Sequence, residues 1–253
     1  MVDYTQINAD TIDRWVQEGW EWGKPVTREE CARAREGIWN VVLTPTKPVP
    51  KAWFGEIQGS RLLGLAAGGG QQMPLFAIAG AQCTLMDYSP RQLESDRMVA
   101  RREGLEIEIV RGDMTRRFPF PDASFDLIFH PVSNCYVEDV EHVWRECFRV
   151  LRPGGRLLAG LDNGVNFAYD NDETALTNKL PFNPLKDKAL LEQCMRNDDG
   201  IQFSHTIGEQ IGGQLRAGFV LRDVYDDTNG TGPLHDHGVP TFWATFAEKP
   251  GCV

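Results

Sequence analysis

The sequence RLLGLAAGGGQQMPLFAIAGAQCTLMD, residues 61–87, decides the fold class. RLLGLAA has the apolar run of a buried strand, and the three glycines that follow form a turn. Residues 71–79 are expected to form a helix that ends at Gly80, and QCTLMD, residues 82–87, is a second strand. A strand, a helix and another strand in so short a stretch predict a crossover unit with two parallel strands.

The same alternation continues toward the C-terminus. Ser89 and Pro90 start a helix that runs to Gly104, and an apolar stripe predicts another helix over residues 140–151. A turn at residues 153–155 leads into a strand, and a last helix ends at Gly218. The further strands are expected at residues 105–110, 125–130, 156–162, 219–225 and 241–247. Residues 226–240 join the last two strands without a helix, so this pair is expected to be antiparallel.

This order predicts an α/β fold with a doubly wound, seven-stranded sheet that is mostly parallel and has an antiparallel last strand. Helices should cover both faces of the sheet. Residues of about 163–203 interrupt the alternation with a polar composition and two prolines, which indicates an insertion over the carboxyl edge of the sheet. The sequence therefore predicts a domain over residues 56–253 and a helical N-terminal lid segment over residues 1–55.

The N-terminal segment is rich in tryptophan. One helix is expected early in it, and a second begins at a capping box of Thr27 and Glu30 and carries Ile38, Val41 and Val42 toward its end. Two interpretations of the tryptophans stay open: they form the contact between these helices and the sheet, or they wall a lid over an apolar or planar ligand. Five of the seven tryptophans lie here: Trp15, Trp20, Trp22, Trp39 and Trp53.

Ligands of an open parallel sheet bind outside the carboxyl ends of its strands. The first such end is the glycine turn, where backbone N–H groups are expected to approach a ligand closely. Asp87 ends the second strand, where a carboxylate accepts hydrogen bonds from ribose hydroxyls. Asp113 and Met114 follow the third strand and would lie beside an adenine, the alternative being a surface turn. A dinucleotide fingerprint would need glycine where Met73 stands, which disfavours a nicotinamide cofactor.

Together these segments resemble the class I S-adenosylmethionine-dependent methyltransferases, in particular the small-molecule group similar to the ubiquinone-biosynthesis methyltransferases. The segments that carry the resemblance are LLGLAAGGG, MDYSPRQLE, RGDM, FPDASFDLIF and WRECFRVLRPGGRLLAG. It implies a Rossmann-like fold and S-adenosyl-L-methionine as cofactor. The cofactor-binding residues that it implies are Ala66, Gly68, Gly70, Asp87, Tyr88, Asp113, Met114 and His130.

The sequence departs from this family at two places. Gly64 stands where an acidic residue usually precedes the glycine loop, and Ala66 replaces the first glycine, which affects the usual anchoring of the cofactor's amino acid moiety. Residues 130–136 read HPVSNCY, where relatives carry an apolar stretch followed by histidines. Ser133, Asn134 and Tyr136 are therefore candidate polar contacts to substrate or cofactor.

The resemblance implies in-line transfer of a methyl group to a small-molecule acceptor, a reaction in which the protein mainly orients the nucleophile and sometimes removes a proton. The candidate catalytic residues are His130 and Tyr136, and His235 and His237 are further candidate bases. These last two are interpreted as solvated loop residues, and no metal is expected. Two other functions stay open: an S-adenosylmethionine-binding protein without transferase activity, and an NAD(P)-dependent oxidoreductase.

Composition limits the partners. The 253 residues carry a formal net charge of −10, which opposes binding to nucleic acid, and no apolar run is long enough to span a membrane. Arg111, Arg116 and Arg117 form a small basic cluster that is expected to be a solvated loop. The start, MVDYTQINAD, lacks the features of a signal peptide, and the six cysteines form no C-x-x-C pair. We therefore expect a cytoplasmic protein; a homodimer stays open.

Overall fold

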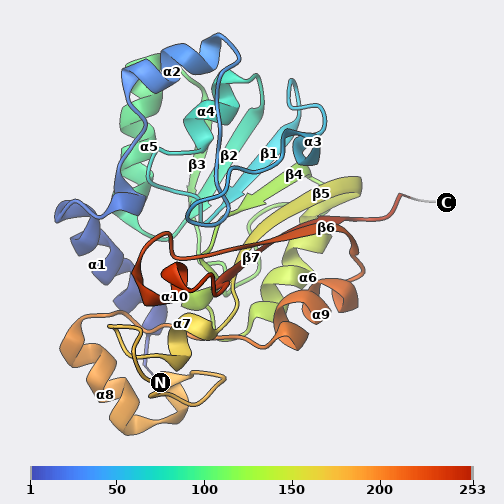
Figure 1. Cartoon of the computed structure of the whole chain (residues 1–253). Coiled ribbons are helices and arrows are strands. Elements are labelled where there is room, and N and C mark those ends of the chain that lie inside the picture. The colour runs from blue at the N-terminus through green and yellow to red at the C-terminus, as the bar shows by residue number, and fades with distance from the viewer. Residues whose placement is uncertain (1, 252–253) are drawn as a thin grey trace.

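The computed structural model describes residues 2–251 and has a seven-stranded sheet with helices on both faces (Figure 1). The strand order is β3-β2-β1-β4-β5-β7-β6, and β7 runs antiparallel to both of its neighbours while the other pairs are parallel. The predicted fold is thereby confirmed. The strands are β1 Arg61–Leu65, β2 Gln82–Asp87, β3 Ile107–Arg111, β4 Phe125–His130, β5 Leu151–Asp162, β6 Val220–Asp227 and β7 Phe242–Glu248.

The helices lie between and before these strands. The α-helices are α1 Tyr4–Gln17, α2 Arg28–Arg35, α3 Lys51–Phe54, α4 Met73–Ile78, α5 Pro90–Glu103, α6 Val140–Val150, α7 Val165–Ala168, α8 Lys188–Asn197, α9 Ile207–Ala217 and α10 Gly232–Asp236. Short 3-10 helices are η1 Glu21–Gly23, η2 Asn134–Tyr136 and η3 Pro184–Lys186. Figure 1 shows α2, α4 and α5 on one side of the sheet and α6 and α9 on the other.

Two hydrophobic cores follow from the alternation of side chains along the strands. Leu62 and Leu158 point into the core beneath α4 and α5, whereas their neighbours Leu63 and Leu157 point into the core beneath α6. All four side chains are fully buried. Because helices cover both faces, the central strands β1, β2 and β4 are mostly buried and apolar, whereas the outer strands β3 and β6 are largely exposed or half-buried.

Three expectations about local structure are wrong. The second helix ends at Arg35, so Ile38 is exposed, and Val41 is buried in the core from an extended segment. β5 begins at Leu151 because residues 153–155 form a bulge within the strand, where the pairing with β4 shifts register. Finally, the connection between β6 and β7 does contain a helix, the short α10.

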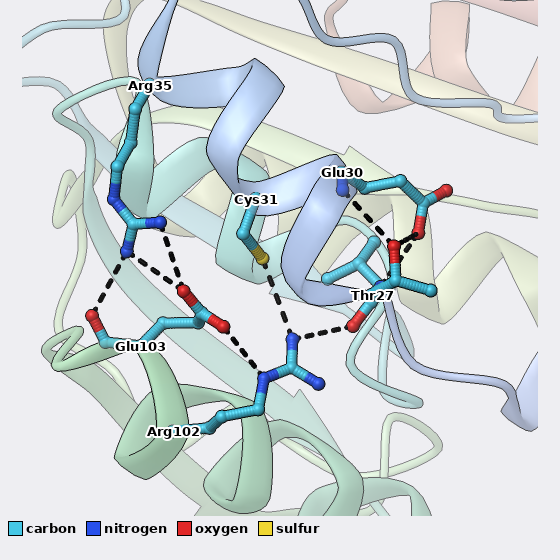
Figure 2. A network of polar contacts seen from close by, with 7 residues as sticks. Thr27, Glu30, Cys31, Arg35, Arg102 and Glu103 are labelled. Atoms are coloured by element: carbon cyan, nitrogen blue, oxygen red, sulfur yellow. Dashed lines mark hydrogen bonds and ion pairs between the residues drawn. The ribbon is translucent and has the colours of Figure 1, made fainter.

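A polar network fastens α2 to the end of α5 (Figure 2). Glu103 lies between two guanidinium groups, with Arg35 at 3.0 Å and Arg102 at 2.8 Å. Arg102 also donates to the backbone carbonyl of Val26 at 2.7 Å and approaches the sulfur of Cys31 at 3.7 Å. The Cys31 thiol is fully buried, so this side chain of α2 reaches into the hydrophobic core on the α4 and α5 side of the sheet. The N-terminal segment is thus packed onto the sheet domain at this end.

The segment after β5 builds a third small core with α1. Ile201 exchanges two hydrogen bonds with the Asn8 side chain, at 2.9 and 2.6 Å, and the Phe203 ring packs edge-on against Tyr4 at 5.2 Å. Phe182 and Cys194 complete the buried part of this core. Figure 1 shows α1 and α8 beside one another at the lower edge of the sheet. Residues distant in sequence therefore form one wall.

Two further features concern the environment. No helix within residues 2–251 is long and apolar enough to cross a membrane. The cysteines of the described part of the chain, Cys31, Cys83, Cys135, Cys147 and Cys194, are free and buried, and Cys252 lies outside that part.

Candidate functional site

A cavity of about 610 Å³ lies at the carboxyl ends of the strands. Ligand pockets for small molecules have volumes of roughly 300–1,000 Å³, so the cavity is large enough for a cofactor and part of a second ligand. Its lining comes from the ends of β1, β2 and β3, from the segment after β4, from the end of β5, from α1 with η1, and from the insertion. The site is thus shared between the sheet and the two added segments.

The structure brings most of the predicted site residues together. Asn134 does not line the cavity, although its neighbours Ser133 and Tyr136 do. Gly70 and His130 are likewise outside the lining. The cofactor residues implied by the sequence that do line the cavity are Ala66, Gly68, Asp87, Tyr88, Asp113 and Met114.

The glycine loop is held by hydrogen bonds within the protein. Gly68 N–H donates to Oδ2 of Asp87 at 3.1 Å, Gly69 N–H to the carbonyl of Gln92 at 3.1 Å, and Gly70 N–H to Oδ2 of Asp96 at 2.9 Å. The expectation that these N–H groups face a ligand is therefore wrong. A Cβ on Gly68 would lie 2.7 Å from Cβ of Gln92, so glycine is required there for close packing of the loop against α5.

Asp87 faces the cavity and fixes the loop at the same time. Its Oδ1 accepts a hydrogen bond from Ser89 N–H at 3.0 Å, and its Oδ2 accepts the one from Gly68. Burial raises the pKa of Asp87, and the two backbone N–H groups oppose that shift. The carboxylate is half-buried at the end of β2 and retains lone pairs for ligand hydroxyls.

The end of β3 supplies the neighbouring part of the wall. Asp113 Oδ1 accepts a hydrogen bond from Thr115 N–H at 2.8 Å, and Arg116 lies 3.9 Å from its Oδ2. Arg111 stacks over the ring of Tyr88 at 4.8 Å and donates to the Tyr88 carbonyl at 3.2 Å. Two members of the basic cluster therefore contact residues of the cavity wall.

The two departures from the family pattern have structural counterparts. A Cβ on Gly64 would collide with the sulfur of Met73, a fully buried side chain, so Met73 occupies the space that a residue at position 64 would need. Ala66 has φ +48, a left-handed backbone that glycine adopts more easily. Its N–H donates to the carbonyl of Met86 at 2.8 Å, which holds the loop in this conformation.

The two candidate catalytic residues differ in accessibility. His130 is fully buried, and its ring nitrogens lie 2.8 Å from the Leu65 carbonyl and 2.6 Å from Oδ1 of Asn134. Burial lowers the pKa of His130. Tyr136 lines the cavity, and burial raises the pKa of its hydroxyl well above the usual value, so the hydroxyl keeps its proton at neutral pH.

The histidine pair near the C-terminus lies in α10 and directly after it. His235 Nδ1 lies 2.6 Å from Oγ1 of Thr228, and His237 follows the helix as its C-cap. Both are outside the cavity lining. Within residues 2–251, no three His, Cys, Asp or Glu side chains gather where they could hold a metal ion.

The tryptophans of the N-terminal segment divide into two groups. Trp39 and Trp53 belong to the hydrophobic core, and Trp15, Trp20 and Trp22 line the cavity. The latter three are called the cavity tryptophans below. Trp39 and Trp53 therefore form the contact with the sheet, as one interpretation expects, and the cavity tryptophans lie where the lid interpretation would place them.

Asp162, the last residue of β5, is buried and lines the cavity, although it is not among the site residues predicted from the sequence. The signal was present, because Asp162 ends an apolar strand as Asp87 does. Its Oδ1 accepts a hydrogen bond from Gly164 N–H at 2.6 Å and its Oδ2 one from Asn166 Nδ2 at 3.0 Å. Burial raises the pKa of Asp162 to about 6.

Comparisons with known proteins agree with this arrangement. Residues 63–159 match a family model described as a methyltransferase domain. The chain is 39% identical over 249 residues to the uncharacterized methyltransferase YbaJ of Bacillus subtilis strain 168, covering 96% of this chain and 97% of that protein. It is 34% identical over 106 residues to the demethylmenaquinone methyltransferase of Tropheryma whipplei strain Twist, covering 42% of this chain and 43% of that protein.

A solved structure shares the fold. An S-adenosylmethionine-dependent methyltransferase from Mesorhizobium loti superposes with a TM-score of 0.61 at 20% sequence identity, covering 78% of this chain and 94% of that chain. At this level of identity the similarity bears on the architecture of the sheet and its helices.

Proposed function

Because this chain belongs to the S-adenosylmethionine-dependent methyltransferase family, we propose that it methylates a small-molecule acceptor bound beside the cofactor in the cavity described above. S-adenosyl-L-methionine supplies an electrophilic methyl group when bound. The observation that carries the proposal is the composition of the cavity wall. Residues at the ends of β1, β2 and β3 form one half, and α1 with the insertion forms the other.

The first half suits the cofactor. We propose that Asp87 accepts hydrogen bonds from the ribose hydroxyls, and that Asp113 and Met114 contact the adenine. Ala66 and Gly68 would lie beside the ribose and the amino acid moiety, with Tyr88 adjacent. Support comes from the presence of all six residues in one lining and from the free lone pairs of the Asp87 carboxylate.

The second half suits the acceptor. We propose that residues 1–55 act as a lid segment and that residues 163–203 form the rest of the acceptor wall, on a domain of residues 56–253. The cavity tryptophans and the core shared by α1 and the insertion support this division. A closed wall would exclude water from the reacting atoms and hold the acceptor in line with the methyl group.

For the candidate catalytic residues, the contacts favour different roles. Tyr136 keeps its proton, so we propose that it orients the acceptor or cofactor as a hydrogen-bond donor. His130 has both nitrogens engaged, and its contacts with Leu65 and Asn134 support a role in positioning the segment after β4.

The proposal also covers the chemical class of the acceptor and the cellular location of the protein. The net charge of −10 supports a small molecule over nucleic acid as the acceptor. Free, buried cysteines support a cytoplasmic location. A homodimer stays an open prediction.

Calorimetric titration tests the proposed function. The protein should bind both S-adenosylmethionine and S-adenosylhomocysteine, whereas NAD(P) should produce no heat of binding. Absence of binding at millimolar concentrations of both adenosyl compounds would refute the proposal. Binding of NAD(P) instead would support the oxidoreductase that the sequence left open.

A further inference from the structure

Asp162 is a buried carboxylate of the cavity wall, at the end of β5 and directly before the insertion. Strand order reverses between β1 and β4, with β2 and β3 on one side of that point and β4 and β5 on the other. Asp87 and Asp113 follow strands on the first side, and Asp162 ends β5 on the second. The side chain thus lies across the switch point from the residues that would hold the cofactor.

Contacts from a distant loop hold this carboxylate in place. Asn166 donates to Oδ2 of Asp162, and the Oδ1 of Asn166 accepts a hydrogen bond from Asn229 at 2.9 Å. Asn229 also donates to Glu173 at 2.6 Å, and Thr241 donates to Oδ1 of Asn229 at 2.9 Å. Such a chain of partners fixes the position of a reactive group in advance of ligand binding.

Among the groups packed together at Asp162, its own carboxylate is the one that can accept a proton near neutral pH. Cys135 of η2 faces it, and burial followed by the charge of Asp162 raises the Cys135 thiol pKa far above the physiological range. Asn166 of α7 donates to Oδ2 of Asp162 and Gln210 of α9 donates to its backbone carbonyl, and neither amide titrates. Tyr136 keeps its proton, as described above. With a pKa of about 6, the Asp162 carboxylate is charged at pH 7. This pKa is also close to the operating pH, which suits a general base.

We propose that Asp162 is a catalytic residue that accepts the proton of the acceptor's nucleophilic atom, so the acceptor carries an ionisable O–H or N–H group. This inference rests on the proposed function. The balance is simple: the oxygen or nitrogen forms a bond to the methyl carbon, the carbon–sulfur bond breaks with its electron pair left on sulfur, and the proton passes to the carboxylate. Asn166 and Asn229 are positioning residues for Asp162.

The charge of the wall narrows the acceptor further. Within the described residues, the cavity lining contains the carboxylates of Asp87, Asp113, Asp162 and Asp199 and no Lys, Arg or His side chain. An anionic acceptor would meet these four carboxylates and no basic side chain in the lining, so the acceptor is neutral or cationic. Aromatic surface in the cavity wall comes from three residues of the insertion, Phe167, Tyr169 and Phe182. A phenol or an amine on a planar apolar body fits this wall.

A cofactor analogue tests the position of Asp162 without knowledge of the acceptor. Sinefungin carries an amine-bearing carbon in place of the sulfonium, so its ammonium group occupies the place of the transferred methyl. If Asp162 lies beside that place, the wild-type protein should prefer sinefungin over S-adenosylhomocysteine. The Asp162→Asn variant should lose about tenfold or more of that preference, the scale of one charged hydrogen-bonding partner. The control Asp122→Asn changes an exposed aspartate before β4, outside the cavity lining and outside both proposed acceptor segments, and should leave the preference unchanged.

The preference for sinefungin should also depend on pH, which would not be expected if Asp162 had only a structural role. Lowering the pH through about 6 protonates Asp162, so the wild-type preference for sinefungin should fall and that of Asp162→Asn should stay flat. Equal preference in wild type and Asp162→Asn at all pH values would overturn the proposal. Retained binding of S-adenosylhomocysteine shows that the variant is folded; wild-type protein that binds neither compound refutes the proposed function itself.

Turnover gives a second measurement. With labelled S-adenosylmethionine and a panel of phenols, amines and thiols, Asp162→Asn should lower kcat toward phenols and amines by about 100-fold or more, the usual contribution of a general base. Thiols ionise near pH 8.5 unaided and should be affected less. Asn229→Ala should shift the acidic limb of the pH profile and leave the KM for the cofactor unchanged. Unchanged kcat toward phenols and amines in Asp162→Asn contradicts the assignment, and the sinefungin comparison decides it where no panel member is methylated.

Discussion

Replacing Asp87 by asparagine should separate cofactor binding from stability. The carboxylate accepts backbone N–H groups of Gly68 and Ser89 through different oxygens, at 3.1 and 3.0 Å. An amide of the same shape has one accepting oxygen, so one of these bonds is lost, at about 1 kcal/mol. Burial raises the pKa of Asp87, so the neutral amide also avoids a desolvation penalty that offsets this loss. We expect the free energy of unfolding to change by no more than about 1 kcal/mol.

Cofactor affinity should respond much more strongly. Hydrogen bonds to a charged group contribute about 1.5–3 kcal/mol, which corresponds to a loss of about 10- to 100-fold in affinity for S-adenosylhomocysteine. Calorimetry measures the affinity and urea denaturation measures the stability, with the exposed Asp122→Asn as the control. Unchanged affinity in Asp87→Asn would mean that the ribose does not bind at the end of β2. Equal losses of stability and affinity would mean that the variant acts through the loop alone.

Three further predictions follow from packing, burial and the cavity wall. Gly64→Ala should lower the free energy of unfolding, measured with urea, by about 1–3 kcal/mol, because the new Cβ collides with Met73. An unchanged free energy of unfolding would show that Met73 can move to make room for the methyl group. Burial raises the pKa of Asp96 to about 8, above its value in the unfolded chain, so the free energy of unfolding should fall as the pH rises from about 4 to about 8. Urea titrations of Asp96→Asn at several pH values should lack this contribution to the pH dependence. Binding of S-adenosylhomocysteine should change the intrinsic fluorescence, and replacing the three cavity tryptophans by phenylalanine should abolish the change while calorimetric binding persists.

The fold could be predicted because its central strands are buried on both faces. Such strands are short apolar runs bounded by glycine, proline or a helix cap, and β4 and α6 were located to within a residue from these signals. The end of α2 was missed for a physical reason. Val41 is apolar because it reaches the core from an extended segment, and a hydrophobic residue near helical spacing does not reveal which of the two structures buries it.

The site was predictable where position along a strand decides it. Asp87 and Asp113 were found because ligands bind at the carboxyl ends of parallel strands, and the comparisons confirm the family that these segments resemble. Asp162 obeys the same rule and was overlooked. Its partners could not be found from sequence, because Asn166 and Asn229 lie 63 residues apart, one in the single-turn helix α7 and the other in a loop, and no periodic pattern links them. The enclosure of His130 likewise depends on the Leu65 carbonyl of another strand.

The unusual glycine loop is best understood from the side chains beneath it. In this chain Asp87 and Asp96, from β2 and α5, accept the N–H groups of Gly68 and Gly70. These two carboxyl groups fix the loop through hydrogen bonds, so its shape does not depend on an acidic residue at position 64. The space at that position is filled by Met73, which makes the loop part of the hydrophobic core. A loop anchored in this way keeps its conformation without ligand, and a preformed site loses less entropy when the cofactor binds.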